Sequence, residues 1–376
     1  MAKFMVGAVA CMWLATALAT FAPGMFEEEI LAAGSGMGVF AQILFGFAAG
    51  AHIRFGRHAH HKYTKGTLVL LFTSFVVPFV LGCLLAIPTS HFVKLSGDTG
   101  DSMTAALAMG TLVAVTALAV LVAQLLTSGR IRSKLGVLVI AMAIGHDIAL
   151  WLLVAFLRAS TLEVMQLIGV VIFLILMVVS YFILDSEDLK PWKKWYAVIL
   201  MIVAPIFSDE VGLHFLVGAV LFGIDMPNSW KLFLSKIEKP LMTLTVPYFI
   251  VPAGSVLNLG NIEPSVLVLA FVMCITNLVG QFVGSTLIAR TQGYSWNDAL
   301  TVGSDMATKG VAEYAVAGSL FDGGSGLISR VLYYSTLLMA MVLTTLSGWM
   351  SQYFHWRARK EVHEAQVSSA VVVGAD

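Results

Sequence analysis

The chain has 376 residues, of which 12% are charged and 59% are hydrophobic, and its 22 basic and 22 acidic residues cancel. Soluble domains carry about a quarter charged residues, so this composition excludes a soluble enzyme, a disordered chain and a nucleic-acid-binding protein. It predicts an all-α integral membrane protein embedded in a lipid bilayer.

The hydrophobic pattern predicts about twelve transmembrane helices, because about 20 apolar residues are needed to cross a bilayer. In chain order they cover residues 4–22, 36–53, 67–88, 103–127, 136–157, 163–184, 195–208, 211–226, 240–259, 264–288, 297–318 and 327–352. The seventh and eighth helices are short and separated only by Ser208, Asp209 and Glu210, which indicates an interrupted pair.

We expect residues 1–352 to form one transmembrane domain, and residues 353–376 to form a short, disordered cytoplasmic tail. The first predicted helix also fits a signal peptide. Its cleavage is the alternative, and it would leave eleven helices in the same orientation.

The distribution of basic residues predicts the orientation. When the N-terminus is placed inside, all lysines and arginines fall in inside segments except Lys94, Arg158, Lys309 and Arg330. Cytoplasmic loops are rich in these residues, so we expect both termini to be cytoplasmic. A bacterial plasma membrane is the predicted location.

Asp147 lies near the middle of the predicted helix 136–157. An ionisable residue at this depth costs roughly 2.5–3.5 kcal/mol on insertion scales and usually has a function. A carboxylate that holds either a proton or a cation, but not both, is the minimal machinery for exchange. The alternative is a structural Asp paired with a lysine in the bundle.

His146 precedes Asp147, and adjacent residues on a helix point in different directions, so only one of the two can face a given site squarely. The imidazole either titrates near neutral pH or serves as a neutral hydrogen-bond partner.

A second group of charges lies in the predicted helix 297–318, at Asp305, Lys309 and Glu313. Lys309 and Glu313 are four residues apart, so they share a helix face and can pair. Two interpretations stay open, a salt bridge that holds an interrupted helix and direct contact with an ion. Helix ends exposed by a break can stabilise ions.

Weaker polar signals lie within other predicted helices. They are Thr116, Thr276, Asn277, Thr344 and Thr345. Alone, such residues more often join helices by hydrogen bonds than bind ligands. The cluster of His58, His60 and His61 is interpreted as part of a solvated loop, and we expect neither a resident metal nor a cofactor.

Several motifs occur together in the order found in one transporter family. They are Ala114–Leu121, the His146–Asp147 segment, Gly212–Ala219 followed by Phe222, Gly223 and Pro227, Thr308–Glu313, and Leu343–Thr345. From about residue 36 to 352 the chain thus resembles the cation:proton antiporters of the Kef/CHX-like branch.

The resemblance implies a sodium/proton antiporter fold with inverted repeats, at about 67–157 and 264–352, and two interrupted helices that cross near Asp147. The remaining helices would form a scaffold and the interface of a homodimer. It also implies that Asp147 binds a cation and a proton in turn during elevator-like alternating access, with Thr116 offering oxygen ligands at the crossing.

Two residues depart from the family pattern. His146 stands where the family has the first carboxylate of a pair, and Asn277 stands where many members carry Lys or Arg. Both changes remove charge, which predicts electroneutral exchange of one K⁺ or Na⁺ per proton. The alternatives are a sodium-coupled organic-anion symporter on the same fold and a non-transporting membrane sensor. An enzyme is not expected.

Overall fold

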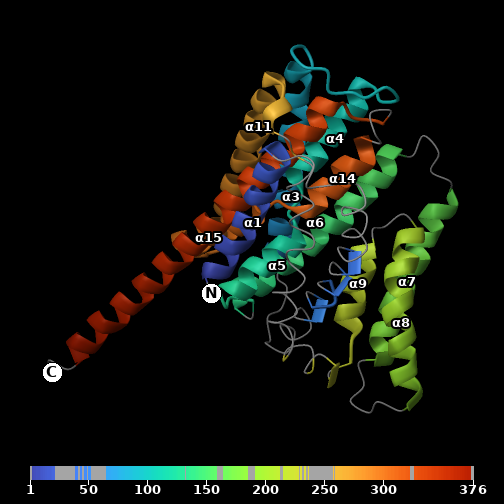
Figure 1. Cartoon of the computed structure of the whole chain (residues 1–376). Coiled ribbons are helices and arrows are strands. Elements are labelled where there is room, and N and C mark those ends of the chain that lie inside the picture. The colour runs from blue at the N-terminus through green and yellow to red at the C-terminus, as the bar shows by residue number, and fades with distance from the viewer. Residues whose placement is uncertain are drawn as a thin grey trace.

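The structure is a computed structural model that describes residues 2–21, 65–131, 133–158, 164–184, 191–211, 215–227, 257, 259–321 and 326–373, with short pieces of 39–51 and 229–236. This part of the chain is built from helices (Figure 1). Its only β-type pairing is the bridge between Ser96 and Ile328. The predicted helix 240–259 lies almost wholly outside the described residues, and 36–53 only partly within them.

The first predicted interruption is confirmed. After the uninterrupted helix α3 (Lys65–Thr89), the span expected at 103–127 consists of α4 (Ser102–Ala114) and α5 (Leu118–Thr127). The residues between them leave the helical conformation, with Val115 extended at φ −71° and ψ 146°. The straight helix α6 (Lys134–Arg158) follows.

The second half of the chain repeats this order. The α11 helix (Pro264–Asn277), the π-helical segment η3 (Leu278–Val283) and α12 (Gly284–Thr291) form one continuous rod. The interrupted pair α13 (Trp296–Met306) and α14 (Val311–Phe321) comes next, and α15 (Arg330–Val373) completes the unit. The second predicted interruption is therefore confirmed as well.

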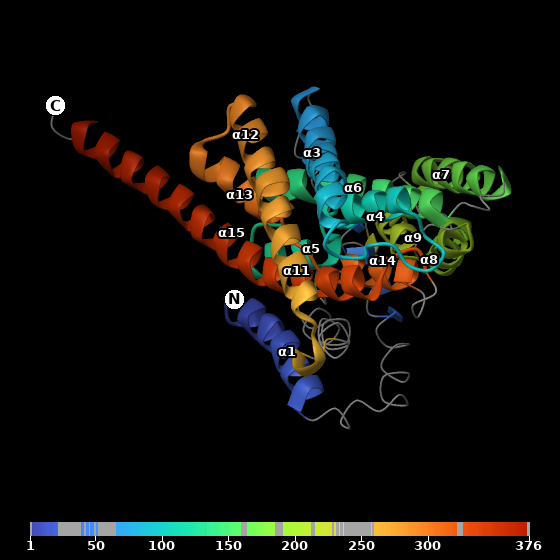
Figure 2. The same ribbon diagram turned by 90° about the horizontal axis from the view of Figure 1, so that it is seen from above.

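The other helices flank these two units. They are α1 (Ala2–Phe21), α7 (Val164–Leu184), α8 (Pro191–Glu210), α9 (Phe215–Asp225) and the short η2 (Leu259–Asn261). Seen from above, α7 and α8 lie on the opposite side of the molecule from α12 and α15 (Figure 2). The α1 helix packs against α15, where the Trp13 indole donates a hydrogen bond to Thr345 Oγ1 at 3.1 Å.

Four described helices are long and apolar enough to cross a membrane. They include Gly66–Thr89, Lys134–Val154, Pro264–Thr291 and Arg330–Glu361. Large apolar side chains are exposed on the outer faces of α3 and α7, for example Phe72 and Phe182 at 69% and 72%, as expected for helices that face lipid. The total of twelve helices stays a prediction.

Two sequence-based expectations are wrong. The predicted break at Ser208–Glu210 does not occur, because α8 continues through Glu210 and the chain turns at Val211. The expected disordered tail is instead helical, because α15 continues to Val373 and projects away from the other helices (Figure 1). This segment contains strong helix formers, and Lys360 pairs with Glu364 one turn later at 3.6 Å.

Candidate functional site at the crossing of the interrupted helices

The two interruptions lie against each other. The backbone N–H of Ala117 donates to the Thr308 carbonyl at 3.0 Å. The Thr116 hydroxyl donates to the Met306 carbonyl at 2.6 Å. Each interruption thus supplies the other with partners for backbone groups that a continuous helix would have satisfied internally. Thr116 lies at the crossing, as the resemblance implies.

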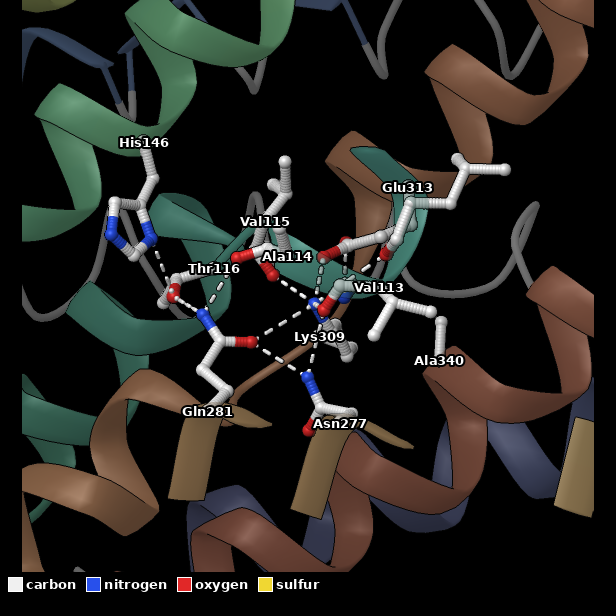
Figure 3. Close-up of polar contacts among 12 residues, drawn as sticks. Val113, Ala114, Val115, Thr116, His146, Asn277, Gln281, Lys309, Glu313 and Ala340 are labelled. Carbon is white, nitrogen blue, oxygen red and sulfur yellow. Dashed lines mark hydrogen bonds and ion pairs between the residues drawn. The ribbon is translucent and has the colours of Figure 1, made fainter. Parts of the chain in front are cut away.

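Lys309 binds the C-terminal end of α4 (Figure 3). Its ammonium, fully buried, donates to the carbonyl of Val113 at 2.7 Å, to that of Leu112 at 3.5 Å, and also to that of Val115. These carbonyls come from the last turn of α4 and the interruption, where the helix presents its negative end. The lysine therefore joins the second interrupted helix to the first.

Glu313 neutralises this lysine and caps α14. Its Oε1 lies 3.7 Å from Lys309 Nζ, so the predicted pair is confirmed, and both side chains are fully buried. Its Oε2 accepts the N–H of Gly310 at 2.7 Å. A carboxylate that reaches back to the start of its own helix is the second half of a capping box, and it complements the positive end of α14.

Gln281 and Asn277 extend the network from the third direction, through η3 and α11. The Gln281 amide donates to Thr116 Oγ1 at 2.7 Å and to the Ala114 carbonyl at 2.8 Å. Its oxygen accepts from Asn277 Nδ2 at 2.6 Å and from Lys309 Nζ at 3.3 Å. Gln281 was not predicted as a site residue, although its position one helical turn after Asn277 places the two amides on one face.

His146 is held on both ring nitrogens. Nδ1 lies 3.1 Å from Thr116 Oγ1 and Nε2 lies 2.9 Å from Ser74 Oγ. The Thr116 hydroxyl has one hydrogen, which goes to Met306, and it already accepts from Gln281. Nδ1 must therefore carry a hydrogen and donate it to Thr116. The imidazole thus ties α6 to α3 and to the crossing.

Among the described residues, Asp147 is not hydrogen-bonded to this network. Its side chain is 5% exposed, and its Oδ1 has no hydrogen-bond partner among the described residues. It lies at a small pocket between α5, α6 and α9. The other lining residues are Leu118, Ile144, Ile148, Val217, Val220 and Leu221. The expectation that His146 and Asp147 face different sites is thus confirmed.

Asp305 belongs to a separate cluster rather than to the one around Lys309. Its carboxylate accepts hydrogen bonds from both terminal nitrogens of Arg130, at 2.9 and 3.1 Å, and also from the hydroxyl of Ser351. Arg130 donates to Ser351 Oγ at 2.6 Å. Arg130 was assigned to a cytoplasmic loop on sequence grounds, yet it is 3% exposed. Its tie to Asp305 links the α5–α6 turn to α13 and α15.

Two of the weaker polar candidates in the sequence, Thr276 and Thr344, donate hydrogen bonds to backbone carbonyls. Thr344 donates to the Lys309 carbonyl at 2.5 Å and Thr276 donates to Val272 within its own helix at 2.7 Å. The residues His58, His60, His61 and Gly212–His214 lie outside the described part of the chain. Within that part, no group of His, Cys, Asp and Glu side chains is arranged to hold a metal ion.

The arrangement can do one kind of chemistry with the described groups. In the interior, Lys309 is paired with Glu313, and Arg130 is paired with Asp305. The Asp147 carboxylate lies among the apolar side chains of the pocket instead, within electrostatic reach of the Glu313 carboxylate. A buried carboxylate without a fixed partner must be neutralised by a bound proton or a bound cation, so Asp147 can hold either.

Comparisons with known proteins identify the family of the chain. Residues 39–355 match the sequence model of a family described as "Sodium/hydrogen exchanger, transmembrane". K(+)/H(+) antiporter 1 of Saccharomyces cerevisiae is 26% identical over 323 residues, which cover 77% of this chain and 36% of the yeast protein. The chain therefore spans little more than a third of that relative.

A second relative is matched over most of its length. Na(+)/H(+) antiporter NhaS4 of Synechocystis is 23% identical over 294 residues, with 73% of this chain and 71% of that protein covered. Among solved structures, the sodium proton antiporter MjNhaP1 from Methanocaldococcus jannaschii superposes with a TM-score of 0.61 at 13% identity, over 92% of this chain and 90% of that one.

Proposed function

The chain belongs to the sodium/hydrogen exchanger family and has the sodium/proton antiporter fold, and on this premise we propose that it exchanges a monovalent cation, K⁺ or Na⁺, for a proton across the plasma membrane. Asp147 is the proposed binding residue, and it holds the cation and the proton in turn.

The environment of Asp147 carries this proposal. The carboxylate is almost fully buried, and its Oδ1 lacks a partner in the described structure, while the buried Lys309 is committed to Glu313 and to the end of α4. A structural aspartate at this depth would be expected to have such a partner. No partner of Asp147 Oδ1 is found within the part of the chain that the structure describes, which leaves the site to a mobile proton or cation.

The surroundings also suggest how the site is exposed alternately to the two sides of the membrane. Direct hydrogen bonds link α4, α6, η3 and the two interruptions, and one from Thr308 to Gln124 adds α5. The other bonds are made by Thr116, Gln281, Lys309 and His146. The contacts of Asp147 with α9 are made through apolar side chains. Apolar surfaces can slide without breaking directional bonds, so we propose that the linked helices move as one body past α9.

Proton flux in inside-out vesicles tests the proposed function. The vesicles come from a host that lacks its own antiporters, their lumen is acidified, and Na⁺, Li⁺ or K⁺ is added in turn. We expect cation-driven alkalinisation with the wild-type protein, and its loss with Asp147→Asn. Asp209→Asn is the matched control, because Asp209 is exposed at the end of α8, and it should transport as the wild type does.

Two results would contradict the proposal. One is exchange that survives Asp147→Asn, which would place the binding residue elsewhere. The other is the lack of response to any cation between about pH 6 and pH 9 with protein present in the membrane. That second result would favour a symporter or a sensor on the same fold.

A further inference from the structure

Lys309 lies in an oxygen cage of the type that binds a monovalent cation. Around its Nζ stand the carbonyls of Leu112, Val113 and Val115, the Gln281 side-chain oxygen and one carboxylate oxygen of Glu313. Carbonyl oxygens that replace a hydration shell are the usual ligands of K⁺ in membrane proteins. The cage is closed to solvent, since the lysine and Glu313 side chains are both fully buried.

The charge of the cage also favours a cation. Without the ammonium it would contain the Glu313 carboxylate and the negative end of α4, and no described cation would offset them. Leaving a charge buried without a partner is costly, so a cage emptied of its lysine should take up a monovalent cation from solution. An ammonium group and K⁺ are similar in size and carry the same charge.

We propose that Lys309 is a tethered cation that permanently occupies a second cation site at the crossing and thereby closes it to the transported ion. One consequence of this inference rests on the proposed function, namely that Asp147 is left as the exchanging site near the crossing. Binding of a cation to the emptied cage is independent of whether the protein transports ions.

Thermal unfolding in detergent tests this inference. Both proteins carry Asp147→Asn, so that a cation bound at Asp147 cannot contribute to the result. The proteins compared are Asp147→Asn and Asp147→Asn/Lys309→Ala. Each is titrated with K⁺, Na⁺, Rb⁺, ammonium or n-propylammonium, with N-methyl-D-glucamine chloride holding the ionic strength constant. The substitution Lys309→Ala removes three carbons and the ammonium, so n-propylammonium restores the atoms that were lost.

A ligand that binds only the folded state raises the melting temperature saturably. We expect a saturable rise of roughly 3–10 °C in the Lys309→Ala protein with n-propylammonium and with at least one inorganic cation. The Asp147→Asn protein should show no cation-specific shift. Adding Glu313→Gln to the double variant removes the negative charge of the cage and should abolish the response.

Three outcomes would overturn the inference. They are the absence of a cation-specific shift in the Lys309→Ala protein, the same shift when Lys309 is present, and a shift that persists after Glu313→Gln. Lys309→Met serves as a folding control, because its side chain fills most of the cage without a charge. If Lys309→Met folds but Lys309→Ala folds in none of the salts, the cage does not accept a cation and the inference also fails.

These outcomes are separable from those of the transport assay. Asp147→Asn removes the proposed exchange from every protein in the titration, so no shift depends on transport. A wild-type protein that moves no ions would contradict the proposed function and leave the cage result intact. A cage that binds no cation would leave Asp147-dependent exchange intact.

Discussion

At the scale of single residues, Gln281 connects several members of the polar network. It is fully buried, and its amide contacts Thr116, Asn277, Lys309 and the Ala114 carbonyl. An amide can serve both the threonine and the lysine because it carries a donor and an acceptor on one planar group. An apolar residue of similar size offers neither.

We therefore expect Gln281→Leu to destabilise the protein by about 1–3 kcal/mol, because buried polar groups lose their partners. The melting temperature in detergent measures this effect. Gln292→Leu is the matched control, because Gln292 is exposed after α12, and it should change the melting temperature little. Equal effects of the two substitutions would contradict the role assigned to Gln281.

At the scale of elements, α3 and α4 approach each other closely through glycines. A Cβ atom built on Gly82 would lie 2.7 Å from the Cα of Gly110, and a Cβ on Gly318 in α14 would meet no heavy atom within 4 Å. Small residues at such contacts allow helix backbones to pack closely within membranes.

The two positions should respond to alanine with opposite signs. Gly82→Ala is expected to cost about 1–3 kcal/mol, because backbone atoms of α4 would have to shift. Gly318→Ala is expected to gain about 0.5–1 kcal/mol, because alanine restricts the unfolded chain and favours the helix. Thermal unfolding of both variants checks this, and a stabilising Gly82→Ala would show that the close approach is not required.

The pair of Arg130 and Asp305 joins three other elements, the α5–α6 turn, α13 and α15. Arg130→Met leaves the buried Asp305 without its positively charged partner, and we expect a loss of about 3–5 kcal/mol. Adding Asp305→Leu removes the unpaired charge and should recover much of this loss. The comparison is again made by thermal unfolding.

The exposed pair of Lys94 and Asp98 is the control for the substitutions of Arg130 and Asp305. They also form a salt bridge, at 3.7 Å, but their side chains are 70% and 74% exposed. Lys94→Met should therefore change stability by less than about 1 kcal/mol. If Arg130→Met were as mild as Lys94→Met, the buried pair would not hold the three elements together.

At the scale of the whole molecule, the sequence predicts the helices and their interruptions better than it predicts the contacts between residues far apart in the chain. Apolar runs and family motifs place the interruptions near Thr116 and Lys309, and the four-residue spacing predicts the pair of Lys309 with Glu313. The pairing of Arg130 with Asp305 joins residues 175 positions apart, which no local pattern indicates. The continuation of α15 was not predicted, because a polar chain end is typical of disorder even where its residues favour a helix.

The charge balance of the whole molecule leads to a prediction about stoichiometry. The salt bridges of Lys309 with Glu313 and of Arg130 with Asp305 are each neutral and lie among the linked helices. In the described structure the imidazole of His146 is hydrogen-bonded to the hydroxyls of Ser74 and Thr116 rather than to a carboxylate. If Asp147 exchanges one cation for one proton, the moving body carries the same charge in both directions.

Exchange should therefore be electroneutral. In liposomes, proton flux should stop when the cation gradient equals the proton gradient, and an imposed potential of about 100 mV should not move this balance point. One net charge per cycle would shift it about 50-fold, because moving a charge through 100 mV is worth about 2.3 kcal/mol. A potential-sensitive dye verifies the imposed potential. A shifted balance point would mean that a second group titrates, and His146→Gln would then test whether that group is the imidazole, since glutamine keeps a hydrogen-bonding side chain that does not titrate.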